Sequence, residues 1–262
     1  MDGWEWIDRW KDNGWMDGNG LALTELLRLG VRLQLLGSVL VLSCSNGQFW
    51  ALPAAGGWKD KLSHQLDLAT ADLCAWKSAT HSSCSFKRIK LSALHVLAKL
   101  DWPWLKCKAA NAACLTDWLL YKYDSFGPLD DVDSLIRLCL GGFSQVYSVI
   151  KHKHRWLTEA DAATLESGRE AALYGFNALS SLFACQDPPC PLFKMTPKFH
   201  QMDHILRVAV RDKLNPRVFW TLGDESFGGE VALVCRGLHP SSMSVRCVQR
   251  WMAFFFQEAR DF

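Results

Sequence analysis

The stretch over residues 158–191 constrains the fold most, because it marks both ends of one long helix. Thr158 is followed three residues later by Asp161, which is a capping box in which each side chain satisfies an end amide. The proline-rich segment Asp187–Pro191 stops a helix at the other end. Between these ends apolar residues recur at helical spacing, at Leu165, Ala172, Leu173, Phe176, Leu179, Leu182 and Phe183. The sequence therefore predicts a helix over about Glu159–Cys185, the longest element of the chain.

Shorter helices are predicted on both sides of this one, from helical spacing and from residues that begin or end a helix. The first predicted helix after the long one has Thr196 at its cap and Pro197 at its first position. The helix before the long one is capped at Asp130 or Asp131 and carries a kink at Gly141-Gly142. The predicted helices cover about residues 21–38, 59–76, 91–100, 109–123, 132–151, 198–211, 226–235 and 242–258.

A few short strands accompany these helices in the prediction. Val39–Cys44 is an apolar run that ends at the Asn46-Gly47 turn, and Phe49–Leu52 follows as its hairpin partner. Residues 218–221 form another short candidate strand. We therefore expect a mainly α fold, a multi-helix globular domain with at most a few short strands.

The chain is expected to divide into a Trp-rich N-terminal arm, residues 1–20, and a single helical domain, residues 21–262, with a sub-boundary near 186–197. The chain contains 13 tryptophans, and tryptophan is costly to leave in water. Aromatic side chains also dominate binding hot spots. The arm is therefore a candidate contact for a protein partner.

Composition and charge argue against several classes of partner and of location. The formal net charge is +2, so binding to nucleic acid or to an anionic surface would need a local basic patch. The longest apolar stretch, Leu35–Cys44, is too short to span a bilayer, and we expect no membrane partner. The first residues do not form a secretory signal, and the ten cysteines are too scattered for a disulfide framework. We expect an intracellular protein.

One candidate site is a zinc centre made by Cys185, Cys190, His200 and His204. Their spacing is Cys-x4-Cys-x9-His-x3-His, and two thiolates with two imidazoles form a tetrahedral set that suits Zn²⁺. The middle spacing is shorter than the about 12 residues of a zinc finger. Two interpretations stay open: a small zinc-stabilised nucleic-acid-binding protein, or a helix end, a proline loop and two polar histidines that bind no metal.

A second candidate site uses acids. Asp203, Asp224 and Glu225 supply the carboxylates that hard divalent cations such as Mg²⁺ require in two-metal phosphoryl transfer. Because Asp224 and Glu225 are adjacent, their side chains point in different directions. Acids at the start of a helix are also common caps, so the same residues fit a structural role.

The residues around these acids carry a family resemblance. They read Lys198-Phe-His200-Gln-Met-Asp-His204-Ile-Leu206, then Trp220-Thr221, then Glu225-Ser226-Phe227. About residues 194–230 resemble the C-terminal part of CACTA-type DDE transposases of the Plavaka-like branch. In that family a Lys-x-His-x-x-x-His-Leu helix precedes a Glu-Ser-Phe-Asn segment. The chain as a whole is also similar to transposon-derived proteins of dinoflagellate genomes.

The resemblance implies an RNase H-like core, so the alternative fold is an α+β remnant of such a core. It implies Glu225 as the third catalytic acid, His200 and His204 as supporting residues, Mg²⁺ or Mn²⁺ as cofactor, DNA strand transfer as the reaction and the nucleus as location. The chain departs from the family at Gly228, where the family has Asn. It also lacks an apolar strand that ends in Asp before residue 190. We therefore expect a transposase-derived remnant that is catalytically inactive and binds no cofactor.

Residual association with DNA would use a basic stripe. The candidate DNA-binding residues are Lys194, Lys198, Arg207, Arg211 and Arg217. An amphipathic helix produces the same set of exposed cations without binding DNA. The alternative function is a helical protein–protein interaction module.

Overall fold

The computed structural model describes residues 31–82, 84–96, 102–126, 130–187 and 190–216. Within these ranges the chain forms six α-helices, one short 3-10 helix and no strand, so the mainly α prediction is confirmed. The elements are α3 Val31–Asn46, α4 Trp58–Thr80, η1 Leu91–Ala93, α5 Ala109–Ser125, α6 Asp131–His152, α7 Glu159–Ala184 and α8 Pro197–Arg211.

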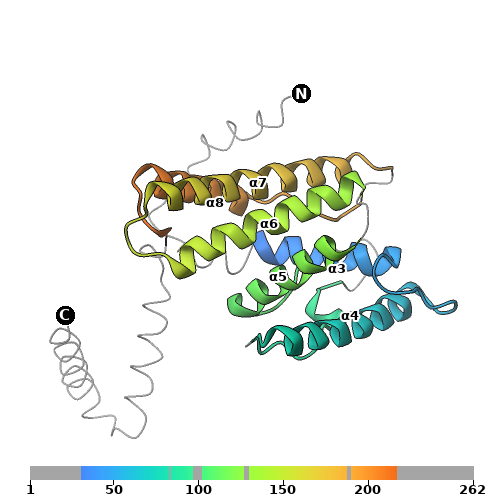
Figure 1. The fold of residues 1–262 in the computed structure, drawn as a ribbon. Helices are drawn as coiled ribbons and strands as arrows, with labels where there is room; N and C mark the ends of the chain where they lie inside the picture. The colour runs from blue at the N-terminus through green and yellow to red at the C-terminus, as the bar shows by residue number, and fades with distance from the viewer. Residues whose placement is uncertain (1–30, 83, 97–101, 127–129, 188–189, 217–262) are drawn as a thin grey trace, which may run out of the picture.

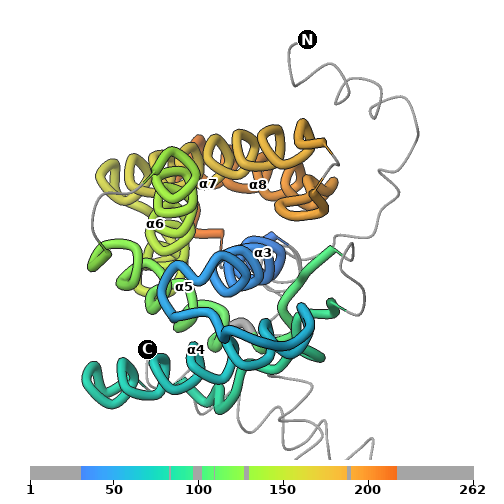
Figure 2. Tube along the Cα trace, turned by 90° about the vertical axis from the view of Figure 1, so that its right-hand side faces the viewer, coloured from blue at the N-terminus to red at the C-terminus, as the bar shows by residue number. Residues whose placement is uncertain are grey.

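Helix α3 lies at the centre of the described structure, with α6, α7 and α8 on one side and α4 and α5 on the other (Figure 1, Figure 2). Residues 31–40 of α3 are buried on every side of the helix, which suits a helix that has no polar face. One hydrophobic core connects α3 with the other α-helices, and this core includes Phe193 and Phe199 beyond the proline-rich segment. The helices on both sides of that segment therefore share their packing.

Three buried polar side chains of α3 connect it to distant parts of the chain. Buried polar groups destabilise a fold unless they find a partner, and each of these finds one. The pairs are Gln34 with the Thr196 hydroxyl, Ser38 with the Phe193 backbone amide and Ser43 with the Tyr123 hydroxyl, at 3.4, 3.0 and 2.9 Å. These bonds fix the rotation of α3 inside its apolar surroundings.

Arg32 places a cation in the core beside α6. Its Nη2 donates to the Phe143 carbonyl at 3.1 Å, and its guanidinium carbon lies 4.7 Å from the centroid of the Tyr147 ring. Its Nε, which is buried, has no hydrogen-bond partner among the described residues. Burial lowers the pKa of Arg32 to about 10, so the side chain stays charged at neutral pH.

Helices α6 and α7 pack side by side, and glycines allow their backbones to come close (Figure 1). A Cβ atom at Gly142 would lie 2.5 Å from the Ala172 nitrogen and 2.6 Å from the Gly168 oxygen. A Cβ atom at Gly141 would have no neighbour within 4 Å. Helix α6 continues through both glycines. Of these two residues, only Gly142 lies where a side chain would collide with α7.

The helix ends confirm the capping predictions. The Thr158 hydroxyl accepts from the Asp161 amide at 3.1 Å, and the Asp161 carboxylate accepts from the Thr158 amide at 3.3 Å. At the start of α6 the Asp130 carboxylate accepts from the Asp133 amide at 2.7 Å. Helix α7, with 26 residues, is the longest described helix, as the sequence predicts.

The strands predicted over Val39–Cys44 and Phe49–Leu52 are wrong. Helix α3 continues to Asn46, and the residues after it form a turn and an irregular segment. A short apolar run cannot distinguish a buried strand from a buried helix, because both are apolar on every side. The helix predicted over 91–100 is described only as far as residue 96, where residues 91–93 form a 3-10 helix.

Several predictions fall on residues outside the described ranges. They concern the Trp-rich arm at 1–20, the strand at 218–221 and the helices over 226–235 and 242–258. None of the helices that the structure describes is both long enough and apolar enough to cross a bilayer.

Candidate nucleic-acid interface on helix α8

Helix α8 packs one apolar face against α7. Its buried residues recur at helical spacing, at Phe199, Met202, Asp203, Leu206 and Ala209. The Phe199 ring lies 4.0 Å from the Phe176 ring of α7, between centroids. Thr196 is the N-cap residue and Pro197 lies in the first turn, as predicted, although the Thr196 side chain makes no capping bond. The Thr196 hydroxyl lies instead 3.4 Å from the Gln34 amide of α3.

The outer face of α8 carries a stripe of basic side chains. His200, His204, Arg207 and Arg211 are separated by four, three and four residues, which places them on one face of an α-helix. His200 is half-buried and the other three are exposed. This stripe contains two of the predicted DNA-binding residues and both histidines of the predicted sites.

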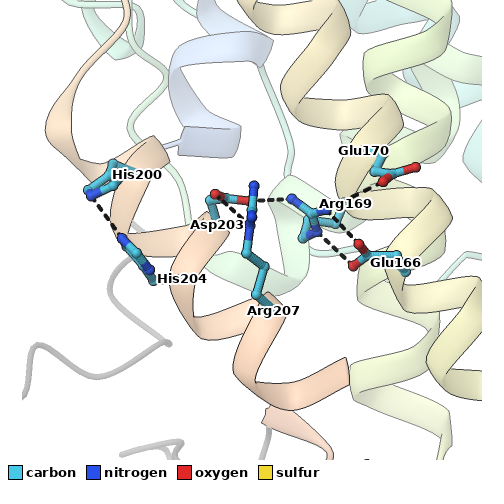
Figure 3. A network of polar contacts seen from close by, with 7 residues as sticks. All are labelled: Glu166, Arg169, Glu170, His200, Asp203, His204 and Arg207. Atoms are coloured by element: carbon cyan, nitrogen blue, oxygen red, sulfur yellow. Dashed lines mark hydrogen bonds and ion pairs between the residues drawn. The ribbon is translucent and has the colours of Figure 1, made fainter. Parts of the chain in front are cut away.

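A network of charges fixes α8 to α7 beneath this stripe (Figure 3). The Arg169 guanidinium of α7 bonds the Asp203 carboxylate of α8, and it also bonds both Glu166 oxygens, at 2.6 and 2.8 Å. From the outer face Arg207 Nε lies 3.0 Å from the Asp203 carboxylate. The hydrogen bonds from Arg169 hold the pKa of Glu166 below its usual value. Asp203 therefore has a structural role between two arginines.

The C-terminal end of α8 lies against the turn between α6 and α7. The Leu157 amide donates to the Lys213 carbonyl, and the Asn215 amide donates to the Arg155 carbonyl, both at 2.8 Å. The buried Asn215 side chain also donates to three carbonyls around the end of α6, those of Val149, Ile150 and Lys153. These bonds join two basic segments, and we call residues 151–156 and 207–213 together the basic corner.

The basic corner combines cations with an exposed aromatic ring. It holds six lysines and arginines, two histidines and one acid, Asp212. Trp156 is 66% exposed, and the Arg155 guanidinium carbon lies 5.6 Å from its ring centroid. Proteins that bind nucleic acids use cations to contact phosphates and aromatic rings to stack on bases. The composition of the basic corner suits such a partner.

Four of these six cations also contact a carboxylate. The pairs are Lys153–Asp161, Arg207–Asp203, Arg211–Asp212 and Lys213–Glu159. The four cationic side chains are between 46% and 71% exposed, and the Arg211 and Lys213 pairs, whose acids are exposed as well, contribute only about 0–1 kcal/mol. In these two pairs a phosphate can therefore replace the carboxylate at little cost.

Of the five predicted DNA-binding residues, only two belong to the basic corner. Arg207 and Arg211 belong to the basic corner, whereas Lys198 is exposed on a different side of α8. Lys194 precedes α8, and its Nζ lies 4.7 Å from the centroid of the Trp102 ring. Arg217 lies outside the described residues.

The four predicted zinc ligands do not form one site. His200 and His204 contact each other, whereas Cys185 lies at the C-terminal end of α7 and the Cys190 amide bonds the Phe183 carbonyl. In the described ranges, no three His, Cys, Asp or Glu side chains gather in a way that could hold a metal ion. The structure therefore keeps the histidine pair but does not support the Cys₂His₂ set, because its two cysteines do not join the pair.

The structure describes only one of the three acids of the predicted two-metal site. Glu225 and Asp224 lie outside the described residues, so their geometry stays untested. Asp203 is described, and its carboxylate is already bonded by Arg169 and Arg207. A carboxylate between two guanidinium groups does not fit a ligand of Mg²⁺ or Mn²⁺, which would be repelled by both cations.

Sequence patterns give no sign of two residues that build the basic corner. Trp156 follows a predicted helix end, and Asn215 contacts that end from about sixty positions further along the chain. Arg169 did leave a signal, since it stands four residues after Leu165 and three before Ala172 on the apolar stripe of α7. A cation on a buried stripe requires a buried anion, which is Asp203 here.

Comparisons with models of protein families, with curated proteins and with solved structures found no match to this chain.

Proposed function

We propose that this protein derives from a transposase, has lost catalysis and still associates with DNA through the basic corner. The observation that best supports DNA association is the bonding by Asn215, which joins two distant basic segments into one exposed surface. The transposase origin rests on the resemblance over residues 194–230. The loss of catalysis rests on Gly228 and on the missing upstream acids. The nuclear location that we propose rests on the same resemblance.

The basic corner would bind the phosphate backbone rather than read a sequence. Its arginines and lysines are exposed and exchange weak carboxylate partners for phosphates, which releases counterions from the DNA. Contacts of this kind set the position and strength of binding but carry no sequence information. Trp156 adds a flat surface on which an unpaired base can stack. Moderate affinity with strong salt dependence is therefore expected.

The salt dependence of binding to a short duplex tests the DNA association. The double variant Arg207→Ala/Arg211→Ala removes two cations from the basic corner while Arg169 still holds Asp203. We expect weaker binding and a slope of log K against log salt that is smaller by about 1.8, since each phosphate contact contributes about 0.9. Fluorescence anisotropy at several salt concentrations measures both quantities.

The matched control is Arg88→Ala/Arg137→Ala. These two arginines are also exposed and each contacts one carboxylate, Asp67 and Asp124 respectively. Arg137 lies about 21 Å along α6 from Lys151, at 1.5 Å per residue. The control should keep the wild-type slope. A wild-type protein that does not bind DNA, or a control that loses as much binding as the test variant, contradicts the proposal.

Loss of catalysis is tested separately, with labelled duplex DNA and either Mg²⁺ or Mn²⁺. We expect no nicking and no strand transfer by the full chain. Metal-dependent nicking that disappears in the Glu225→Gln variant would show an intact active site and would overturn this part of the proposal while leaving DNA association untouched.

A further inference from the structure

His200 and His204 form a pair whose geometry suits a metal ion. They stand four residues apart on α8, with 4.2 Å between ring centroids and 81° between ring planes. Their Nε2 atoms lie only 2.9 Å apart, so one ring donates and the other accepts. The two nitrogens thus face each other. The helix backbone holds the two residues about one turn apart before any ligand arrives, which reduces the entropy lost on binding.

The distance between the nitrogens is close to what a tetrahedral metal requires. Zinc binds imidazole nitrogen at about 2.0–2.1 Å, which places two tetrahedral ligand atoms about 3.3 Å apart. The pair needs to open by only about 0.4 Å from its hydrogen-bonded distance to admit the ion. Small ring rotations provide such a change, and the donor ring must carry its proton on Nδ1 instead of Nε2 when both Nε2 atoms bind the metal.

The position of the pair allows access from solvent. His204 is exposed and His200 is half-buried, on the side of α8 away from the apolar face. Figure 3 shows both rings apart from the Arg169 network, with their nitrogens facing each other. The closest cation in sequence on this stripe, Arg207, has its Nε 3.0 Å from the Asp203 carboxylate, which offsets its repulsion of a metal ion.

We propose that His200 and His204 form a chelating site for a borderline divalent transition-metal ion such as Zn²⁺ or Ni²⁺. Two imidazoles supply two ligands, and water completes the coordination shell. Imidazole favours these ions over Mg²⁺ and Ca²⁺, which prefer oxygen. The site does not involve Cys185 or Cys190, and it does not depend on DNA association.

Calorimetric titration of the full chain with Ni²⁺ at pH 7.5 tests the site. We expect one equivalent bound by the wild type, and a loss of about 10²-fold in affinity in either His200→Ala or His204→Ala, since a single imidazole loses the chelate. The conservative His204→Gln variant should lose binding as fully as alanine does.

The control for surface histidines is His152→Ala/His154→Ala. These two residues are also exposed but stand two apart, and only His152 lies within a helix. The control should bind Ni²⁺ like the wild type. Circular dichroism of every variant shows whether α8 still folds, and a Ni²⁺-dependent rise in Tm, absent in both histidine variants, reports binding to the folded state.

Thiol binding is distinguished with Co²⁺, because thiolate ligands give an intense charge-transfer band that imidazole does not. Weak absorption without that band, lost in His200→Ala, supports the proposal. A strong thiolate band with unchanged affinity in both histidine variants overturns it, as does a wild type that binds Ni²⁺ no better than the variants.

Discussion

Arg169 and Asp203 form an ion pair across the interface of α7 and α8, with only 7% and 10% of their side chains exposed. Glu166 and Arg207, which are more exposed, extend this pair at its two ends, so the charges alternate in sign along a line of four residues. This line crosses from α7 to the outer face of α8 (Figure 3). The pair therefore sets the position of the helix that carries the basic stripe.

Replacing Asp203 with leucine should lower the free energy of unfolding by about 2–4 kcal/mol, because a buried arginine then loses its main partner in the interface. Glu166 still pairs with Arg169 in this variant and compensates part of its charge. The expected loss is therefore at the low end for a broken buried pair. The double variant Arg169→Met/Asp203→Leu should lose much less than the sum of the two single variants. Urea unfolding followed by circular dichroism measures the coupling, and additive losses would argue against an energetic link.

Lowering the pH should destabilise the interface of α7 and α8, because it protonates Glu166. Its folded-state pKa lies below the value of about 4.3 in an unfolded chain, so its contribution is complete above that pH and is lost as the pH falls through the folded pKa. Glu166→Gln should therefore reduce stability at pH 7 and flatten the decline of stability below about pH 4.3. Glu170→Gln is the control, since that side chain is 66% exposed and 3.5 Å from Arg169. Thermal unfolding across this pH range decides, and equal declines in both variants would contradict the assignment.

The helical architecture could be predicted because its signals are local. The Thr158–Asp161 capping box and the Asp130 cap each lie within four residues, and both helix starts are confirmed. The strand predicted over Val39–Cys44 failed for the opposite reason. Whether an apolar run becomes a buried helix depends on what surrounds it, and α3 is covered by helices from far along the chain.

The candidate site was only partly predictable for a related reason. Helical spacing alone places His200, His204, Arg207 and Arg211 on one face of α8. It cannot reveal that the residues before Trp156 join this face, because that contact depends on Asn215 and on the antiparallel packing of α7 and α8. It also cannot separate the histidine pair from Cys185 and Cys190, since sequence spacing gives no distance across the proline-rich segment.

Two adjacent glycines of α6 should respond oppositely to alanine. Gly142→Ala should lower the free energy of unfolding by about 2–3 kcal/mol, because its Cβ would overlap the backbone of α7 at Ala172. Gly141→Ala should raise it by about 0.5–1 kcal/mol, because open space surrounds that position and alanine favours helix. Each variant controls for the other in chemical change and in sequence position. Chemical denaturation measures the difference, and stabilisation by both variants would show that α6 and α7 are not in close contact.

The stability of the fold should depend on the packing of the Arg32 side chain and not on its charge. Its guanidinium is buried with one carbonyl partner and an unbonded Nε, so the fold carries part of its desolvation penalty. Methionine has a similar length and no charge, and the Phe143 carbonyl lies within α6, where the helix supplies another donor. We expect Arg32→Met to raise the free energy of unfolding by about 1 kcal/mol, as seen when apolar residues replace buried charges.

The Arg32→Ala variant separates charge from packing. It removes the same charge but leaves a cavity beside Tyr147, and it should lower the free energy of unfolding by about 2 kcal/mol. Thermal and urea unfolding of the two variants at neutral pH gives the comparison. If methionine is as destabilising as alanine, the guanidinium stabilises the core, and the contacts with Phe143 and Tyr147 outweigh its desolvation.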